Sequence, residues 1–340
     1  MTIAPQVPSW LHAHPSSAVL DVVSGGTRGD KTPLVVKFTF FALKSNLPAS
    51  LRTTFVATYS STSGDAKVVS LDLLLPLHLA CRLRPPVKTA QFKLTLETAA
   101  GPLPLTDIFE DTIYACADAG VDMTAALGPS AAAAMAFQMW SPDTLSGAIA
   151  VVSILVSKQG GRYRLQSDSL PALYVVAQEL RRRLVSRFQD GPDPKPVTCV
   201  DELPINSYFL YINEHFNRRK LLEDLYAQLN DRAHMFRTVQ KRLLVRFKDK
   251  NPSLMEGLSE LMETTYSRIL QLSDEIEENQ QIVARLMNDI SCISKLLCLM
   301  LHLCHESVSE EDRALLERYL CVDMCEGHEN GWEESVRIYP

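Results

Sequence analysis

The chain has 340 residues, of which 46% are hydrophobic and 22% charged, and its formal net charge is -6 with a pI near 5.8. This length allows two or three domains, and the composition is that of an ordinary globular protein. An acidic balance argues against general nucleic-acid binding, which usually shows as a basic domain. We therefore expect no nucleic-acid partner, and any basic surface must be local.

The cysteines and the apolar runs indicate a reduced compartment. Eight cysteines are scattered along the chain, and no secretory signal follows Met1, so we expect free thiols in the cytosol. The most apolar run, Ile293 to Cys304, contains Lys295 and His302 and is shorter than the roughly 18 to 20 residues that span a bilayer. We interpret it as a buried helix.

The first hundred residues alternate between apolar and polar side chains, which is typical of half-buried strands. Val36, Phe38 and Phe40 share one face of "PLVVKFTFFALK", and further runs follow near residues 52–59, 68–75 and 91–97. Turns rich in Gly, Pro and Ser separate them. The pattern predicts an antiparallel β-sandwich over residues 1–100.

Residues 101–200 mix the two periods and predict a small α/β platform. A strand is expected from about Met135, followed by a hairpin of "AIAVVSILVSK" and "RYRLQ". Ser169 is placed to cap the next helix, whose apolar stripe leaves the arginines of residues 181–183 on its flanks. A proline-rich linker at residues 191–196 ends the domain.

Residues 203–306 predict a long α-helical hairpin or coiled coil. Apolar residues recur at three-four spacing from Leu222 to Leu243, and again over about six heptads from Met262 to Cys304. The second helix would be roughly 80 Å long. Asn279 occupies one seam position, a device that fixes register at some expense of stability. The connection between the helices ends at Asn251 and Pro252, and C-terminal helices are expected over residues 307–340.

Motifs for catalysis and cofactor binding are absent, so we expect no enzyme and no cofactor. The stretch "SGGTRGDKT" at residues 24–32 approaches a phosphate loop, but Asp30 separates Gly29 from Lys31, which favours a hairpin loop. The one metal candidate is a zinc cluster of Cys321, Cys325 and His328 with Cys304. Its spacing is irregular, and free cysteines are commonly small buried side chains, so we assign no metal site.

Two basic clusters allow two interpretations. One contains Arg181, Arg182, Arg183 and Arg187, and the other lies where the first long helix ends and contains Lys241, Arg242, Arg246, Lys248 and Lys250. They are either solvated faces whose aliphatic stems cover the core or sites for an acidic partner or an anionic membrane. We expect Leu243 and Phe247 to point inward beside the second cluster.

Several long stretches resemble a known family. "GRYRLQSDSLPALYVVAQEL", "FRTVQKRLLVRFKDKNPSLMEGLSELMETTYSRILQLSDEIEENQ" and "GWEESV" are similar to the C-terminal half of the ninth Bardet-Biedl syndrome protein family, the PTHB-type subunits of the BBSome. "LLLPLHLACRLRPPVKTAQFKLTLET" resembles a strand-rich segment of that family, so the resemblance runs from about residue 34. The family's N-terminal β-propeller has no counterpart, which suggests a fragment, a truncated gene model or a divergent short form. The zinc candidates are not part of the family pattern.

The resemblance implies a gamma-adaptin ear type β-sandwich, an α/β platform and a helical hairpin. It implies a scaffold subunit of a coat-like complex that moves membrane proteins into and out of cilia. The expected partners are other BBSome subunits of propeller-appendage and tetratricopeptide types, with membrane contact through an Arf-like GTPase. The expected localisation is the cytoplasm, the base of the cilium or flagellum and, peripherally, the ciliary membrane.

Two functions remain open. As an assembly subunit, the chain would offer an exposed apolar patch that includes Leu296, Leu297, Met300 and Leu301, with Arg242, Arg246, Lys248 and Lys250 as further contact residues. As an adaptor-like module, it would bind cargo tails through a groove in the platform, near Phe137 or Trp140, or through the edge of the sandwich.

Overall fold

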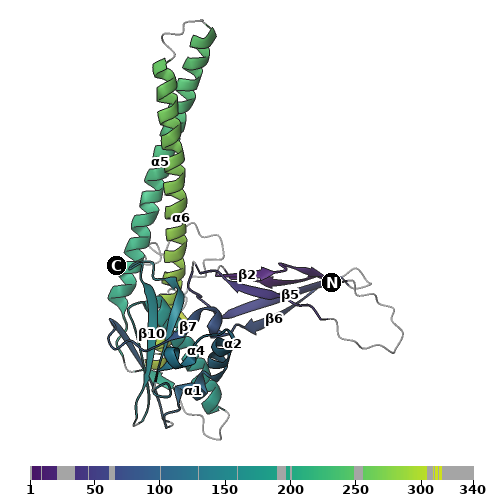
Figure 1. Ribbon diagram of the computed structural model, residues 1–340, viewed down its shortest axis with the longest axis vertical. Coiled ribbons are helices and arrows are strands. Elements are labelled where there is room, and N and C mark those ends of the chain that lie inside the picture. The colour runs from purple at the N-terminus through teal and green to yellow at the C-terminus, as the bar shows by residue number, and fades with distance from the viewer. Residues whose placement is uncertain are drawn as a thin grey trace, which may run out of the picture. The chain divides into compact units, whose positions relative to one another are not determined.

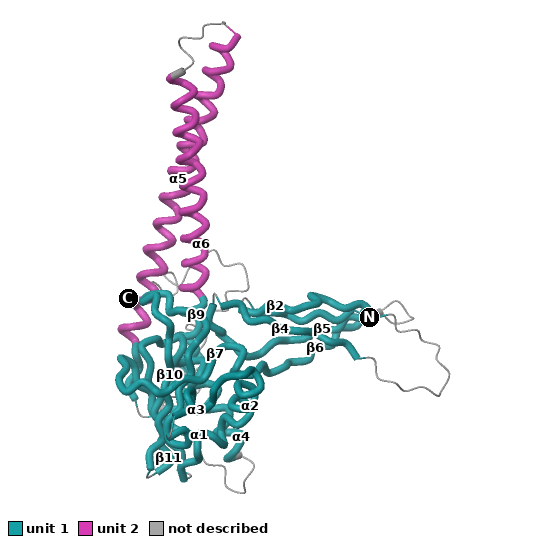
Figure 2. Tube along the Cα trace, in the orientation of Figure 1, with its two compact units in different colours: residues 1–204, 288–323 teal, residues 205–287, 324–340 magenta. Residues whose placement is uncertain are grey.

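A computed structural model gives the fold of the chain. It describes residues 2–8, 10–20, 35–44, 46–60, 66–99, 101–128, 130–158, 160–189, 197–199, 201–248, 256–304, 309, 311–312 and 314–315. The chain forms two compact units, one of residues 1–204 and 288–323 and the other of residues 205–287 and 324–340 (Figure 2). The first unit holds the strands, and the second holds most of the long helices (Figure 1).

The N-terminal strands form two small sheets. One has the strand order β3 (Ala18–Val19), β1 (Thr2–Gln6), β5 (Arg52–Ser60) and β6 (Ala66–Leu74), and the other pairs β2 (Leu11–His14) with β4 (Thr39–Ala42). The rings of Phe38 and Phe40 lie 5.4 and 6.0 Å from that of Phe55, so aromatic contacts join the two sheets. The predicted strands near residues 52–59 and 68–75 are confirmed.

A six-stranded antiparallel sheet forms the centre of the same unit. Its order is β12 (Val197–Cys199), β8 (Phe92–Thr98), β11 (Gly161–Ser167), β10 (Ile149–Val156), β9 (Ala134–Pro142) and β7 (Cys81–Arg84). The predicted hairpin is β10 and β11, with Ile154 opposite Leu165. β9 confirms the strand expected from Met135.

The boundary expected near residue 100 does not separate the sheets. β7 pairs with β9, and β8 pairs with β11 and β12, so both strands belong to the six-stranded sheet. The short helix η1 (Leu77–Leu79) precedes β7. Pairing between segments so far apart leaves no local signal, because β8 has the same alternation as the strands before it.

Helices cover one face of the six-stranded sheet. α4 (Leu170–Gln189) is preceded by Ser169, whose side chain accepts a 3.5 Å hydrogen bond from the Ala172 amide. The shorter helices are α1 (Leu105–Ile108), α2 (Glu110–Asp118) and α3 (Met123–Leu127). The rings of Phe109 and Phe137, both fully buried, lie 4.9 Å apart and join the helical layer to the sheet.

The sequence predicted that the arginines of residues 181–183 lie on the flanks of α4, but Arg183 does not. Arg183 is only 9% exposed, and its guanidinium donates to Glu179 at 2.6 Å and to the Ile108 carbonyl at 2.8 Å. It also pairs with both oxygens of Asp111 and lies 4.7 Å from the centre of the Phe109 ring. Arg183 therefore joins α4 to α1 and α2 inside the core.

The long helices confirm the predicted hairpin. α5 spans Ile205–Lys248 and α6 spans Glu256–Cys304. Between residues 205 and 287 the seam residues follow the predicted heptads, since Leu225, Leu272 and Ile276 form a buried cluster with Leu222 and Leu229 packed against it. Further toward the end of the hairpin, the rings of Phe236 and Tyr266 lie 6.0 Å apart.

Asn279 pairs within the hairpin. Its side-chain oxygen accepts a 3.2 Å hydrogen bond from Arg218 of α5, and its side-chain nitrogen donates to the Glu275 carbonyl at 2.8 Å. Arg218 is held in turn by Glu214 at 2.8 Å. One polar pair across an apolar seam fixes which turns of the two helices meet, because sliding either helix leaves the amide unpaired.

The last third of α6, from residue 288, belongs to the first unit. Asn288 donates to the Leu47 carbonyl at 2.7 Å, and Lys295 donates to the Ala49 carbonyl at 3.4 Å. Cys292 and Cys298 are buried free thiols. α6 is therefore amphipathic in the hairpin and buried nearly all round beyond it.

Some expectations fall on residues outside the described ranges. They concern the glycine-rich loop at residues 24–32, the linker at residues 191–196, the connection at Asn251 and Pro252, and most of the C-terminal helices over residues 307–340. Ser309 and Asp312 are described, and the Ser309 hydroxyl donates to Asp312 at 2.8 Å.

The polar pair at Asn279 generates a stability prediction. Asn279→Leu should raise the free energy of unfolding by about 0.5–1.5 kcal/mol, because a leucine completes the apolar seam and the half-exposed Arg218 regains water. Urea unfolding followed by circular dichroism measures the change, with the exposed Gln281→Leu as the matched control. A stability loss in Asn279→Leu beyond that of the control would contradict this role.

The ion pair of Arg183 with Asp111 generates a pH prediction. Burial alone would raise the pKa of the Asp111 carboxyl, but the hydrogen bonds and charge of Arg183 outweigh burial and lower it from its ordinary value. The stabilisation is thus present above the unfolded-state pKa of about 3.9 and is lost as pH falls through the lower folded-state pKa. The stability difference between wild type and Asp111→Asn should accordingly shrink below about pH 4. A stability difference that stays constant from neutral pH to about pH 3 would contradict this pairing.

Candidate functional site

The apolar residues expected to bind partners on α6 lie in the chain's own core. Leu296, Leu297 and Met300 are 0%, 3% and 2% exposed, and Leu301 is partly exposed. The expectation of an exposed patch here is wrong. A dense apolar run on a helix is compatible with an internal core and with a partner interface, and the sequence alone does not separate the two.

The apolar part of α6 is longer than the run counted from sequence. Between Gly257 and Leu303 an 18-residue window reaches a mean hydropathy of 1.4, which is long and apolar enough to cross a membrane. Of this window, 67% is buried inside the chain. Burial of this extent is that of a core helix, which agrees with the interpretation of the run as a buried helix.

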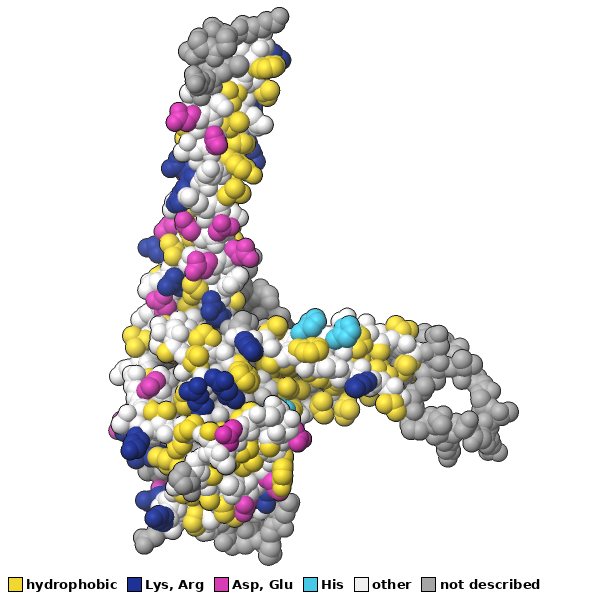
Figure 3. Space-filling view, in the orientation of Figure 1, with side chains coloured by type: hydrophobic (Ala, Val, Ile, Leu, Met, Phe, Trp, Pro, Cys, Tyr) yellow, Lys and Arg dark blue, Asp and Glu magenta, His cyan; other side chains and the backbone are white. Residues whose placement is uncertain are grey.

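The end of α5 exposes apolar and basic side chains together. Leu244, Val245 and Phe247 are 58%, 57% and 72% exposed, so the expectation that Phe247 points inward is wrong. The surrounding cations are exposed as well: Lys241, Arg242, Arg246 and Lys248. We call these seven residues the hairpin tip. Figure 3 shows hydrophobic side chains gathered along this end of the hairpin.

Phe247 is exposed because the seam has ended. Leu243 is the last half-buried seam residue of α5, and every described residue of that helix after it is exposed. Leucine and phenylalanine in water cost free energy that burial against another surface recovers. The basic side chains make this surface positively charged. Four of the five cations expected here are described, and Lys250 lies outside the described residues.

A second apolar surface lies on β6. All nine residues of the strand are exposed, and Val68 and Leu71 reach 65% and 66%. Among the described strands β6 pairs with β5 alone and ends its sheet, so its outer edge offers unpaired backbone groups. The sequence did not predict this exposure, because the alternation in "KVVSLDLLL" indicates that Val69, Leu71 and Leu73 face a core.

The platform shows no open groove at the two residues proposed for it. Phe137 is fully buried, and the partly exposed Trp140 ring has the cations of Lys44 and Arg82 5.2 and 5.6 Å from its centre. Arg82 is also fixed by a 3.0 Å hydrogen bond to Gln138. Trp140 is thus used inside the chain.

The zinc candidates, to which no metal site was assigned, are not tested. Cys321, Cys325 and His328 lie outside the described residues, and only the backbone of Cys304 is described. Within the described ranges no group of three or more His, Cys, Asp or Glu side chains is arranged to hold a metal ion.

The buried apolar residues of α6 and the exposed ones of the hairpin tip lead to different predictions for stability. Leu297→Asp should lower the free energy of unfolding by about 3–5 kcal/mol, because it places a charge in the core. Leu244→Asp at the hairpin tip should change it by no more than about 0.5 kcal/mol. Thermal unfolding of the two variants beside wild type measures both. Equal stability of Leu297→Asp and wild type would contradict the burial of α6.

Comparisons with known proteins match this architecture. The model of the PTHB1 platform domain matches residues 76–202, and that of the PTHB1 hairpin matches residues 202–305. The platform match begins just before β7 and so agrees with the sheet to which β7 and β8 belong. The hairpin match covers α5 and α6.

The similar relatives all carry one name. The chain is 32% identical to mouse (Mus musculus) Protein PTHB1 over 311 residues, which is 88% of this chain and 32% of the relative. It is 31% identical to the human protein over 307 residues, 88% of this chain and 32% of that one, and 32% identical to the Xenopus laevis protein over 305 residues, 86% and 33%. The chain thus spans about a third of the length of these relatives. With both domain models and this similarity, the chain belongs to the PTHB1 family.

Proposed function

We propose that the chain is a non-enzymatic scaffold subunit of a BBSome-like coat complex that moves membrane proteins into and out of cilia. In this proposal it corresponds to the C-terminal half of the PTHB1 proteins, with a gamma-adaptin ear type sandwich before the platform. It works in the cytoplasm and at the base and membrane of the cilium. Family membership supports the proposal, and the hairpin tip is the observation that carries it.

The partners in this proposal are other BBSome subunits of propeller-appendage and tetratricopeptide types. Membrane contact is indirect, through recruitment by an Arf-like GTPase. A long hairpin suits such a scaffold because its paired helices keep a fixed direction over tens of ångströms, about 1.5 Å for each residue. Asn279 with Arg218 keeps the register of the helices, and hence the position of the tip.

The hairpin tip is the contact surface that we favour. Its exposed Leu244, Val245 and Phe247 offer apolar area, and Arg242 with Arg246 offers charge. Interfaces gain most of their free energy from such anchors, while charges at the rim favour the correct partner. We therefore expect a partner surface with an apolar centre and acidic residues around it.

A copurification experiment tests the scaffold proposal. The tagged 340-residue chain is expressed in ciliated cells beside Leu244→Asp with Phe247→Asp, and beside Leu145→Asp, an exposed control in the first unit. Wild type and control should recover BBSome subunits, and the tip variant should lose most of them because its apolar anchors are gone. Failure of wild type to recover any subunit would refute the proposal, and full recovery by the tip variant would remove the tip from it.

A second function, peptide binding, is favoured by β6. Its open edge and exposed apolar residues are what a domain needs to add an extended segment of another protein as a further strand. Backbone hydrogen bonds then supply affinity, and alternate side chains supply specificity. We propose that this edge binds cargo tails or extended partner segments.

A further inference from the structure

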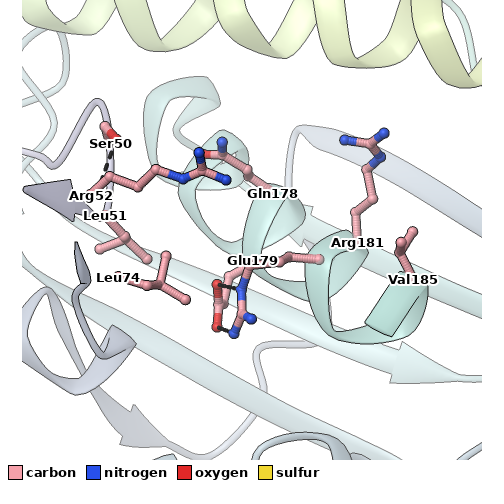
Figure 4. A pocket seen from close by; sticks show the side chains of 9 residues that line it. Ser50, Leu51, Arg52, Leu74, Gln178, Glu179, Arg181 and Val185 are labelled. Atoms are coloured by element: carbon pink, nitrogen blue, oxygen red, sulfur yellow. Dashed lines mark hydrogen bonds and ion pairs between the residues drawn. The ribbon is translucent and has the colours of Figure 1, made fainter. Parts of the chain in front are cut away.

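A pocket with an uneven balance of charge lies beside the end of β6. It has a volume of about 190 Å³, and it lies within the first unit between the start of β5 and helix α4. Leu51, Leu74 and Val185 form its apolar part, and arginines form most of its charged part. Figure 4 shows Arg52 reaching from β5 toward Gln178 of α4, with Leu51 and Leu74 close together.

The carboxylate in the pocket is already paired. Glu179 accepts hydrogen bonds from Arg182 at 2.7 and 2.8 Å and from Arg183 at 2.6 Å, and it is only 4% exposed. Its negative charge is therefore shared between two arginines. The other cations of the pocket, Arg52 and Arg181, have no carboxylate of their own among the residues that line it.

Arg52 and Arg181 lack partners for their guanidinium groups. In the described part of the chain neither group makes a hydrogen bond or an ion pair, and the Nε of Arg181 is buried without an acceptor. A buried donor without an acceptor costs free energy, which a ligand oxygen would recover. Arginine in such a site matches carboxylate and phosphate groups, because its planar fork donates two parallel hydrogen bonds.

The position of the pocket favours the carboxylate of a polypeptide. Arg52 lies opposite Leu74, the last residue of β6, in the strand register, so a segment added at the outer edge of β6 runs toward the pocket. The apolar lining can bury an apolar side chain that lies next to an acidic residue, whereas a phosphate ion has no apolar group to place there. Both features belong to a peptide.

We propose that Arg52 and Arg181 bind the carboxylate of an acidic residue in an extended segment of another protein. Leu51, Leu74 and Val185 receive the apolar residue beside it. The proposal rests on the peptide-binding function inferred for β6, and it adds the acidic residue that the bound segment must carry.

A display library of random 12-residue peptides tests this without assuming any one ligand sequence. The purified 340-residue chain selects peptides, and the folded double variant Arg52→Gln with Arg181→Gln removes those that bind elsewhere. Peptides that remain should carry Asp or Glu next to Leu, Ile or Val. Enrichment of peptides without an acidic residue, or of none at all, would overturn the proposal.

The selected peptides then give the affinity change. Fluorescence anisotropy should show binding to the double variant weakened by about tenfold or more, since each removed guanidinium takes charge-assisted hydrogen bonds with it. Arg164→Gln, an exposed arginine on β11, is the matched control and should bind as wild type does. Equal weakening by the control would reduce the effect to net charge and contradict the site.

Two further experiments distinguish a peptide carboxylate from a lipid phosphate and the pocket proposal from the β6 proposal. Val69→Lys with Leu71→Lys on β6 should also weaken the peptides, because charged lysines oppose strand addition. Vesicles of phosphatidylcholine with a phosphoinositide should not compete; competition that the double variant abolishes would assign the pocket to a lipid headgroup and overturn the peptide. If the β6 variant binds normally while the arginine variant fails, the peptide-binding edge is wrong and the pocket stands.

Discussion

The buried guanidinium of Arg183 holds the platform together. A charge in the core is tolerated only when it is paired and hydrogen-bonded, and Arg183 achieves this with Glu179, Asp111 and the end of α1. The same residues fix where α1 and α2 sit against α4 and the sheet. Arg182 and Arg183 already neutralise the charge of Glu179. Arg181 therefore has no unpaired acidic neighbour among the residues that line the pocket. The three consecutive arginines of α4 thus have different roles. Arg183 stabilises the core, Arg182 pairs with Glu179 nearer the surface, and Arg181 is the proposed ligand-binding residue.

The helices of the second unit place some of their apolar residues in the buried seam and others on the surface. Leu225, Leu272 and Ile276 close the seam, and Asn279 with Arg218 sets its register. The seam ends at Leu243, and the apolar residues beyond it on α5 have no partner in the described chain. An apolar surface of this kind is kept in proteins that assemble with others, because exposed leucine and phenylalanine otherwise promote aggregation. The proposed scaffold function follows from this division.

Local periodicity made much of the fold predictable. The heptads from Met262 onward gave α6, and alternation gave β5, β8 and the hairpin of β10 and β11. Pairing between distant strands was not predictable, since the alternation of β8 does not say that β11 is its neighbour. The site was less accessible. Leu296 to Met300 have the same pattern whether they bind a partner or the core. A sequence also does not show that Arg183 turns inward while the Nε of Arg181 has no acceptor among the described residues.

In the proposed function the chain assembles through the exposed end of its hairpin. Lys241 and Lys248 lie on that tip and carry amines that can be cross-linked in place. Cross-linking followed by mass spectrometry of a BBSome preparation containing this chain tests the claim directly. We predict links from Lys241 or Lys248 to another subunit. Links from these lysines only to residues of the same chain, in a sample where other lysines link to partners, would contradict it.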